Sequence, residues 1–410
     1  MTAMKTEPNY FRASLGMKQE IAPAIAADYH SGIVDWMRAN GNVLPLDGIT
    51  FRLAKEFGFC YGVDKAVDMA YETRLKFPDR RIFLTYEIIH NPSVNNRLKQ
   101  MGIEFLSGAL KGNLTFDDIG PDDVVIMPAF GVPAEYLQQL RAKGSVLVDT
   151  TCGSVVHVWK RVEKYAKDGY TSLVHGKALH AETLATVSQA QKMGGHTIVV
   201  LDKNQAQLVC DIITGDAPPE SIAQLGPMSL SREFDPRKHL DKIGVANQTT
   251  MLANESLEIA AMIGAAMEKR HGRENLPAHF RSFDTICSAT QERQDAIVDL
   301  VQSGHIDMML VIGGYNSSNT GHLLDIAAAT LPAWHISDAA EILSASELRH
   351  QPAHEKVRVT ATDWLPRRAV SIGLTAGAST PNKAIGEVIE RLAELRGVEI
   401  PAEILAFKKT

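Results

Sequence analysis

Short runs of apolar and β-branched residues alternate with longer segments of helical periodicity along most of the chain. Strands are predicted at residues 81–85, 123–127, 146–149, 171–174, 242–246, 308–312 and 370–374. Each run is followed by a polar or glycine-containing loop and then by a helical pattern. This order is typical of parallel α/β units. The predicted fold class is therefore α/β with mainly parallel sheets.

Three cysteines share one local setting, in which a turn, a cysteine and a helical pattern follow each other. Cys60 lies in GFCYGVDKAV, Cys152 in TTCGSVVHVW and Cys287 in TICSATQERQ. The repetition predicts three α/β domains of similar build. We expect an N-terminal extension at 1–48, a first domain at 49–151 completed by 379–410, a second at 152–286 and a third at 287–378. The stretch 202–240, rich in proline, aspartate and lysine, is predicted to be a surface excursion.

Composition and charge narrow the possible partners and the compartment. The 410 residues are 45% hydrophobic and 22% charged with a net charge of -6, which describes a globular chain without a basic field for nucleic acid. No apolar run reaches the ~18 residues of a membrane helix. Four scattered cysteines and the lack of an apolar secretory segment predict a cytoplasmic protein, with a plastid location as the alternative.

A thiol at a helix start is biased toward the thiolate that binds metal. Any one of the three cysteines could instead be a small buried hydrophobe, and Cys210, in the apolar run QAQLVCDII, is predicted to be one. The shared local setting of Cys60, Cys152 and Cys287 favours a common metal site. Thiolates suit zinc, copper or iron-sulfur clusters. The three cysteines are far apart in the sequence and form no CxxC pair, which favours an iron-sulfur cluster over a structural zinc site. Three thiolates would leave one iron of such a cluster without a protein ligand. A zinc ion bound by three thiolates and a water molecule is the alternative.

The loops after two predicted strands are suited to binding an anion. GGYNSSN offers Ser317, Ser318 and Asn319 before a helix, and TAGAST offers Ser379. Helix capping is the ordinary role of such residues. Together with His90 and His180, however, they could hold a diphosphate without a large positive field. The usual nucleotide-binding glycine motifs are missing.

Glu182, two residues after His180, is the candidate acid, and Thr249 in NQTT is a candidate relay hydroxyl. Their alternative roles are a carboxylate that complements a helix dipole and a helix cap. Beside a cluster and a diphosphate, both would be placed to deliver protons during a reduction.

The motifs GFCYGV, EIIHNP, DTTC, HAET, NQTT, TICSATQERQ, GGYNSSN and TAGASTP occur in this order between about residues 50 and 395. They resemble those of the 4-hydroxy-3-methylbut-2-enyl diphosphate reductases, in particular the longer cyanobacterial and plant branch. The resemblance implies a trefoil of three α/β domains around a central 4Fe-4S cluster held by Cys60, Cys152 and Cys287. It implies Glu182 as the proton donor. Diphosphate and substrate contacts are implied for His90, His180, Thr249, Ser317, Ser318, Asn319 and Ser379.

The implied reaction is the last step of the non-mevalonate isoprenoid pathway. A small allylic diphosphate loses its hydroxyl and becomes isopentenyl and dimethylallyl diphosphate, with electrons from an external donor such as ferredoxin or flavodoxin. Phe130 departs from the shorter bacterial branch, which has a diphosphate-contacting histidine there. Gly153 and Ser154 stand where many relatives have proline and a large apolar residue. Two alternatives are a zinc-dependent hydrolase of a small phosphorylated substrate and a non-enzymatic redox sensor or diphosphate-binding regulator.

Overall fold

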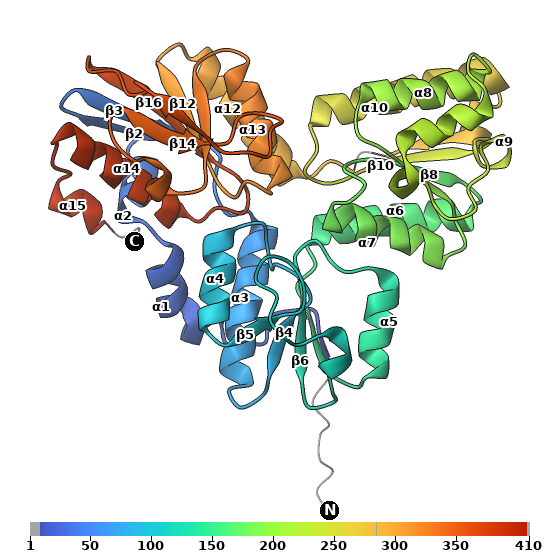
Figure 1. The fold of residues 1–410 in the computed structure, drawn as a ribbon, viewed down its shortest axis with the longest axis horizontal. Coiled ribbons are helices and arrows are strands. Elements are labelled where there is room, and N and C mark those ends of the chain that lie inside the picture. The colour runs from blue at the N-terminus through green and yellow to red at the C-terminus, as the bar shows by residue number, and fades with distance from the viewer. Residues whose placement is uncertain (1–8, 284, 408–410) are drawn as a thin grey trace, which may run out of the picture. The chain divides into compact units, whose positions relative to one another are not determined.

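The computed structural model describes residues 9–283 and 285–407 and contains three mainly parallel β-sheets with helices on their faces (Figure 1). Every strand predicted from the sequence is present, with ends that differ by up to two residues. The predicted α/β class with mainly parallel sheets is thereby confirmed. Contacts within the chain define two compact units. The first comprises residues 9–13, Phe77–Ile88 and Gly102–Cys287, and the second comprises Ser14–Lys76, Ile89–Met101 and residues 288–407.

The first sheet has the strand order β1-β7-β6-β4-β5 and is parallel throughout. Its strands are β1 (Tyr10–Phe11), β4 (Ile82–Leu84), β5 (Ile103–Phe105), β6 (Val124–Met127) and β7 (Val146–Asp149). The strands β6 and β7 are buried along their whole length. Such continuous apolar runs are expected of a parallel sheet with both faces covered. Helix α5 (Ala134–Ala142) connects β6 to β7.

The second sheet has the order β11-β10-β8-β9 and is also parallel. Its strands are β8 (Thr171–His175), β9 (Thr197–Val200), β10 (Ile243–Asn247) and β11 (Phe280–Ser282). Helices α8 and α10 lie on one side of this sheet and α6 and α7 on the other (Figure 1). The helices of this region are α6 (Gly153–Lys167), α7 (Ala181–Lys192), α8 (Lys203–Thr214), α9 (Pro236–His239), α10 (Ala253–His271) and α11 (Leu276–His279).

The predicted surface excursion at 202–240 is wrong for its first part. Residues Lys203–Thr214 form α8, which packs against α10. The polar residues misled the prediction, because Asp202 caps the helix by accepting a hydrogen bond from the Gln205 amide. The apolar positions of the same segment, including Val209 and Cys210, lie in the core of this sheet. The prediction that Cys210 is a core residue is confirmed, and burial raises the pKa of its thiol to about 11.

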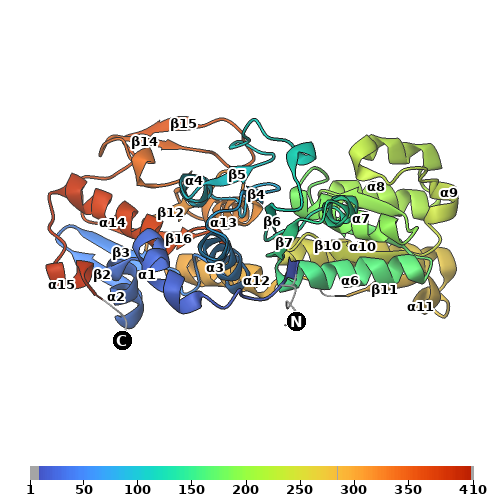
Figure 2. The ribbon, with the colours of Figure 1, turned by 90° about the horizontal axis from the view of Figure 1, so that it is seen from below.

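The third sheet belongs to the second unit and has the order β13-β12-β16-β3-β2. Its strands are β2 (Val43–Leu46), β3 (Ile49–Leu53), β12 (Met308–Ile312), β13 (Ala333–Ile336) and β16 (Val370–Ala376), and only β2 is antiparallel to its neighbour. Alternate residues of β12 face different helices. Leu310 packs with α14 (Asn382–Arg396) and α2 (Gly32–Ala39), whereas Val311 packs with α12 (Ser288–Gln302) and α13 (Ser318–Ala328). A separate hairpin, β14 (Glu347–His350) with β15 (Val359–Thr362), is visible in Figure 2.

The helices of the second unit include the ones that follow Cys60 and Cys287. They are α1 (Lys18–Tyr29), α2 (Gly32–Ala39), α3 (Tyr61–Lys76), α4 (Pro92–Gln100), α12 (Ser288–Gln302), α13 (Ser318–Ala328), α14 (Asn382–Arg396) and α15 (Ala402–Leu405). Strand β3 pairs with β16, and α14 packs on both. Residues 49–53 and 382–396 therefore lie with the third sheet, although the sequence analysis assigned them to the first domain. The division into three domains stays a prediction.

Candidate active site

Each of the three candidate ligand cysteines lies directly before an α-helix. Helix α3 begins at Tyr61, α6 at Gly153 and α12 at Ser288. The predicted helix starts are thereby confirmed. All three thiols are half-buried, and none of them forms a disulfide. A helix start offers unpaired N–H groups and a partial positive charge, which favours the thiolate that binds metal.

Within the first unit, the Cys287 segment reaches the start of α6. The Cys287 Sγ lies 3.6 Å from the Ser154 Oγ and donates to it, and Ser154 is two residues after Cys152. The Cys287 segment is also tied to the end of β10. The Asn247 backbone N–H donates to the Thr285 hydroxyl at 3.1 Å, and that hydroxyl donates to the Asn247 side-chain oxygen. These bonds connect the Cys287 segment both to α6 and to the loop that carries Thr249.

The two residues proposed for proton delivery, Glu182 and Thr249, are in direct contact. The Thr249 backbone N–H donates to the Glu182 Oε1 at 2.6 Å, and its hydroxyl donates to Oε2 at 2.9 Å. Glu182 is only 2% exposed. Burial raises the pKa of Glu182 to about 7, although the two hydrogen bonds from Thr249 act in the opposite direction. A carboxyl group with this pKa can both hold and release a proton near neutral pH.

Gln248 holds the loops of Glu182 and Thr249 together, and the sequence analysis did not single it out. Its side-chain oxygen accepts hydrogen bonds from the Lys177 amide and from the Thr183 hydroxyl, each at 3.1 Å. Its amide nitrogen donates to the Thr250 hydroxyl at 2.7 Å. A Cβ at Gly176 would lie only 2.9 Å from the Gln248 Cβ, so this close packing requires a glycine. The signal was present in the sequence, because Gln248 stands beside Thr249 in NQTT.

His180 caps helix α7, and the hydrogen bond that it accepts there indicates which tautomer a neutral ring adopts. The Nδ1 atom accepts a hydrogen bond from the Glu182 amide at 3.2 Å. In a neutral imidazole the other nitrogen, Nε2, then carries the proton and is a donor. The ring packs edge-on against Phe130 at a centroid distance of 6.4 Å. Phe130 is therefore an aromatic support for the His180 ring.

In the second unit, the loops after β12 and β16 meet the segment that carries His90. The Ser379 hydroxyl donates to the His90 carbonyl oxygen at 3.1 Å, and the Ala378 amide donates to the Asn319 Oδ1 at 2.9 Å. Ser317 caps α13 by accepting from the Thr320 amide at 3.3 Å, and Ser318 is the buried first residue of that helix. The Asn319 Nδ2 is buried and has no hydrogen-bond partner among the described residues. It is therefore a donor suited to an anionic ligand.

Glycines allow the backbone of these loops to approach closely. A Cβ at Gly314 would lie 2.5 Å from the His90 carbonyl oxygen, and one at Gly377 would lie 2.0 Å from the Thr320 hydroxyl. Gly313 has a φ of +151°. Its carbonyl oxygen accepts a hydrogen bond from the buried His335 Nε2 at 2.9 Å. Burial lowers the pKa of His335 to about 4, so its ring is neutral near pH 7.

The candidate residues thus form two groups, each described within its own unit. The first unit holds Cys152, Cys287, His180, Glu182 and Thr249, and the second unit holds Cys60, His90, Ser317, Ser318, Asn319 and Ser379.

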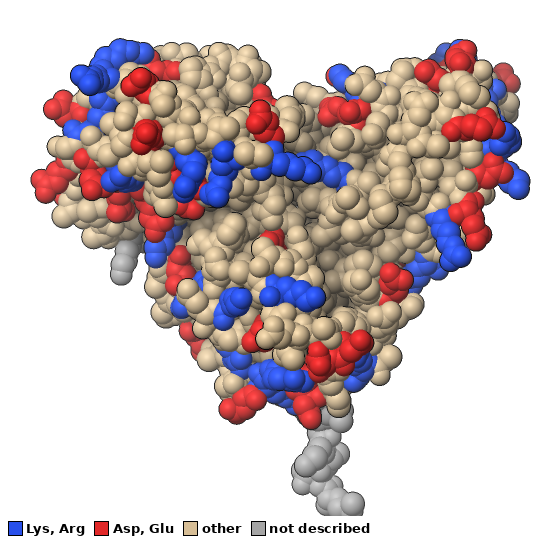
Figure 3. Space-filling model, viewed as in Figure 1, with Lys and Arg blue, Asp and Glu red and all other residues tan. Residues whose placement is uncertain are grey.

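Acidic and basic side chains are interspersed over the face shown in Figure 3. Among the described residues, no helix is both long and apolar enough to cross a membrane.

Comparisons with known proteins agree on one family. The sequence model of the LytB protein family matches residues 51–393. A 4-hydroxy-3-methylbut-2-enyl diphosphate reductase of Gloeobacter violaceus is 47% identical over 395 residues, which cover 95% of this chain and 93% of the relative. The protein of the same name from Thermosynechococcus vestitus is 44% identical over 397 residues and 97% of each chain.

Two solved structures are similar to this chain. A structure of (E)-4-hydroxy-3-methyl-but-2-enyl diphosphate reductase, described as the terminal enzyme of the non-mevalonate pathway, is 28% identical with a TM-score of 0.52 and covers 84% of this chain and 99% of its own. The corresponding reductase of Plasmodium falciparum, 21% identical with a TM-score of 0.60 over 87% and 90% of the two chains, shows the shared fold. The relatives are named reductases, so the hydrolase alternative is not supported. The chain belongs to the LytB family of 4-hydroxy-3-methylbut-2-enyl diphosphate reductases.

Proposed function

We propose that this chain reduces (E)-4-hydroxy-3-methylbut-2-enyl diphosphate to isopentenyl and dimethylallyl diphosphate, the last step of the non-mevalonate isoprenoid pathway. The family assignment supports this substrate and this class of reaction. The observation that carries the proposal is the buried Glu182 carboxyl group, held by Thr249 and with a pKa raised to about 7. A reductive loss of hydroxide needs a proton source of this kind.

The cofactor in this proposal is a 4Fe-4S cluster with Cys60, Cys152 and Cys287 as its ligands. The donor set fits such a group, because the three thiols are half-buried, form no disulfide and are placed at the starts of long α-helices. When bound, the cluster would supply electrons and Lewis acidity. The inclusion of Cys60 rests on its helix-start setting and on the motif that the chain shares with the family.

The diphosphate would be held by neutral donors. The candidates are the His180 Nε2–H, the Asn319 Nδ2 and the hydroxyl groups of Ser317, Ser318 and Ser379, with His90 beside Ser379. Neutral donors can bind a diphosphate in a chain with a net charge of -6, because several of them at once share the negative charge. Anchoring this end of the substrate would fix the position of its hydroxyl-bearing end.

Glu182 would deliver a proton to the reacting end of the substrate. Two electrons and two protons convert the allylic alcohol to an alkene and one water molecule. The carbon that receives the proton decides which of the two products forms. Thr249 would hold the Glu182 carboxyl group in place and re-stabilise it as a carboxylate after the proton has left, because both of its hydrogen bonds favour the charged form.

The electrons would come from an external donor such as ferredoxin or flavodoxin, since the sequence has no nucleotide-binding glycine motif. A cytoplasmic location is part of the same proposal, because none of the four cysteines forms a disulfide.

Metal and sulfide analysis after anaerobic purification tests the cofactor. We expect about four iron atoms and four sulfides per chain. Replacement of Cys60, Cys152 or Cys287 with serine should lower both contents, whereas Cys210→Ser, at the core cysteine, should leave both unchanged. Stoichiometric zinc without sulfide would overturn the assignment, as would an iron content that Cys60→Ser does not affect.

A further inference from the structure

A second group of metal-ligating side chains lies in the first unit, away from the candidate active site. Asp241 lies two residues before the start of β10, His271 ends α10 and His279 ends α11. Thr249 follows the opposite end of β10. A strand of five residues spans roughly 17 Å. The group is therefore separate from the Glu182–Thr249 pair.

The spacing of this group suits one ion. One ligand atom from each of the three residues lies within 4.8 Å of the others. The Asp241 carboxylate places one oxygen 3.4 Å from the His279 Nδ1 and the other 3.9 Å from the His271 Nε2. Neighbouring ligands of a tetrahedral zinc ion, each ~2.0–2.2 Å from the metal, are ~3.4 Å apart. Small side-chain adjustments would bring the three ligands around one ion.

The rings of His271 and His279 are stacked on each other. They stack with a centroid distance of 3.8 Å and an interplanar angle of 12°. The stacked pair lies beside the Asp241 carboxylate, so both rings face the same ligand oxygens.

Hydrogen bonding in the group is incomplete. The His271 Nε2 is buried and has no hydrogen-bond partner among the residues that the structure describes, which is an unfavourable state for a polar atom. The His279 Nδ1 is 2.8 Å from the Asp241 carbonyl oxygen. The same nitrogen lies 3.4 Å from the Asp241 carboxylate, so an ion bound here would take the place of the Nδ1 proton.

A second stacked pair in the same unit, His196 with His239, shows that stacking alone does not make such a group. The centroids of its rings are 3.6 Å apart, and the interplanar angle is 17°. The His196 Nδ1 bonds to the Ser231 hydroxyl at 3.2 Å, and the His239 Nδ1 accepts from the Asp235 amide at 2.9 Å. Within residues 9–283 and 285–407, no third ligand completes this pair into a metal-binding group.

We propose that Asp241, His271 and His279 form a binding site for a divalent transition metal of the zinc type, with water as a further ligand. His279 directly precedes β11 (Phe280–Ser282), and Cys287 follows that strand by five residues. A bound ion would fasten α10 and the start of β10 to the segment that leads to Cys287. Its effect is on stability rather than on the chemical step.

Zinc titration by calorimetry tests the site, performed on the cluster-loaded protein under anaerobic conditions so that the ligand cysteines do not take up zinc. We expect one zinc ion per chain and a rise in Tm on zinc addition. His271→Phe keeps a ring for stacking but removes both nitrogens, so zinc affinity should fall by at least about 10- to 100-fold. His196→Phe makes the same change in the other stacked pair and should bind zinc like the wild type.

Two results would overturn the proposal. Absence of zinc binding by the wild-type protein would mean that the group is a hydrogen-bonded cluster only. Equal binding by the wild type and His271→Phe would place the zinc elsewhere. Should His271→Phe fail to fold, Asp241→Asn decides, because this side chain is 48% exposed and its replacement removes a ligand at little cost in packing.

Discussion

Thr249 donates both its backbone N–H and its hydroxyl to the carboxylate of Glu182, one hydrogen bond to each oxygen. This contact joins the loop after β10 to the start of α7. It opposes the effect of burial on the pKa of Glu182, so that the pKa is about 7 rather than higher.

Glu182→Gln should lower kcat by about two to four orders of magnitude, which is the usual contribution of a positioned proton donor. Glutamine has nearly the same shape but carries no transferable proton. Iron content and substrate affinity should stay unchanged. The control is Glu268→Gln, an exposed glutamate on α10, which should turn over like the wild type. Near-normal turnover of Glu182→Gln would remove Glu182 from the mechanism.

The rate of the chemical step should depend on pH through Glu182. The protonated form is the donor, so kcat/KM should be constant below pH about 7 and fall as the pH rises through this value. Measurement of kcat/KM from pH 5 to 9 checks this, and Glu182→Gln should lose this part of the profile. A limb that persists unchanged in Glu182→Gln belongs to another group.

Glu182 should also affect stability in a pH-dependent way. Its folded-state pKa of about 7 lies above the value of about 4.5 for an unfolded glutamate, so its contribution to stability is full below pH about 4.5 and is lost as the pH rises through about 7. Above this pH the buried charge costs on the order of 3 kcal/mol. Glu182→Gln should therefore have a higher Tm than the wild type at pH 8 but not at pH 4.5. Equal Tm differences at the two pH values would contradict the raised pKa.

Thr249→Val removes one hydrogen bond to the Glu182 carboxylate and keeps the size of the side chain. Because this bond favours the charged form, the pKa of Glu182 should rise, and the alkaline limb of the pH profile should move to higher pH. Thr249→Ser restores the hydroxyl and should restore the wild-type profile. A role of Thr249 in packing alone predicts the opposite ranking, with valine closer to the wild type than serine.

Asn319→Asp tests the anion-binding group of the second unit. Aspartate can still accept the hydrogen bond from the Ala378 amide, but it loses the unpaired Nδ2 donor and adds a negative charge. KM for the allylic diphosphate should rise at least tenfold, since a lost hydrogen bond to a charged group is worth about 1.5–3 kcal/mol. Asn316→Asp, at the exposed neighbouring asparagine, should have a smaller effect. An unchanged KM in Asn319→Asp would remove Asn319 from the binding site.

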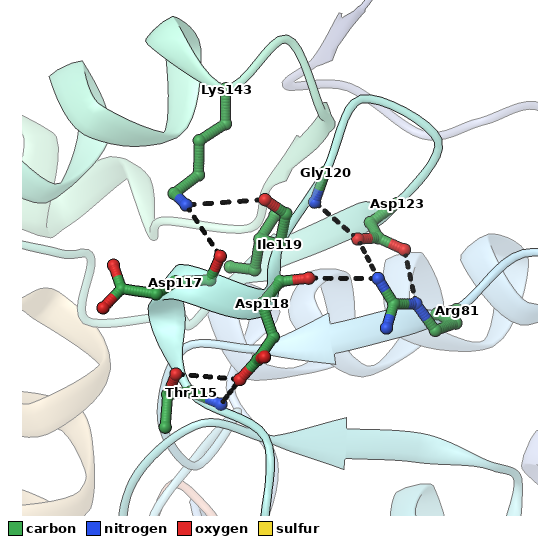
Figure 4. Close-up of polar contacts among 8 residues, drawn as sticks. All are labelled: Arg81, Thr115, Asp117, Asp118, Ile119, Gly120, Asp123 and Lys143. Atoms are coloured by element: carbon green, nitrogen blue, oxygen red, sulfur yellow. Dashed lines mark hydrogen bonds and ion pairs between the residues drawn. The ribbon is translucent and has the colours of Figure 1, made fainter.

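Asp123 should contribute to stability without affecting the chemistry. Figure 4 shows that its two carboxylate oxygens accept hydrogen bonds from the Arg81 guanidinium, at 2.8 and 2.7 Å, and that one of them also accepts from the Gly120 amide. Asp123→Ala leaves these donors without their buried acceptor and should lower the free energy of unfolding by about 1–3 kcal/mol. Asp122→Ala, its exposed neighbour, should change it by less than about 0.5 kcal/mol. Denaturant unfolding of both variants gives the comparison.

The sequence predicted the parallel strands and the helix start after each ligand cysteine, because both follow from local patterns of apolar residues and turns. It could not predict that β3 pairs with β16, since pairing between strands more than 300 residues apart has no local signature. The surface excursion predicted at 202–240 was wrong for the part that forms α8, because helix caps and surface loops use the same polar residues. Asp202 is such a residue, since it caps α8.

The candidate site could be predicted only as a set of residue types. The sequence indicated Glu182 and Thr249 separately, but their contact and the raised pKa of Glu182 depend on burial by the surrounding fold. Gln248 was missed for the same reason, because its role is to join two loops that are 71 residues apart in sequence.

The most direct test of the account is an anaerobic assay of the cluster-loaded protein with the allylic diphosphate and a strong artificial electron donor. We expect isopentenyl and dimethylallyl diphosphate as products, with two electrons consumed for each substrate molecule. A protein with its full complement of iron and sulfide that binds the substrate and returns it with its hydroxyl group intact would contradict the account and favour a sensor or regulator.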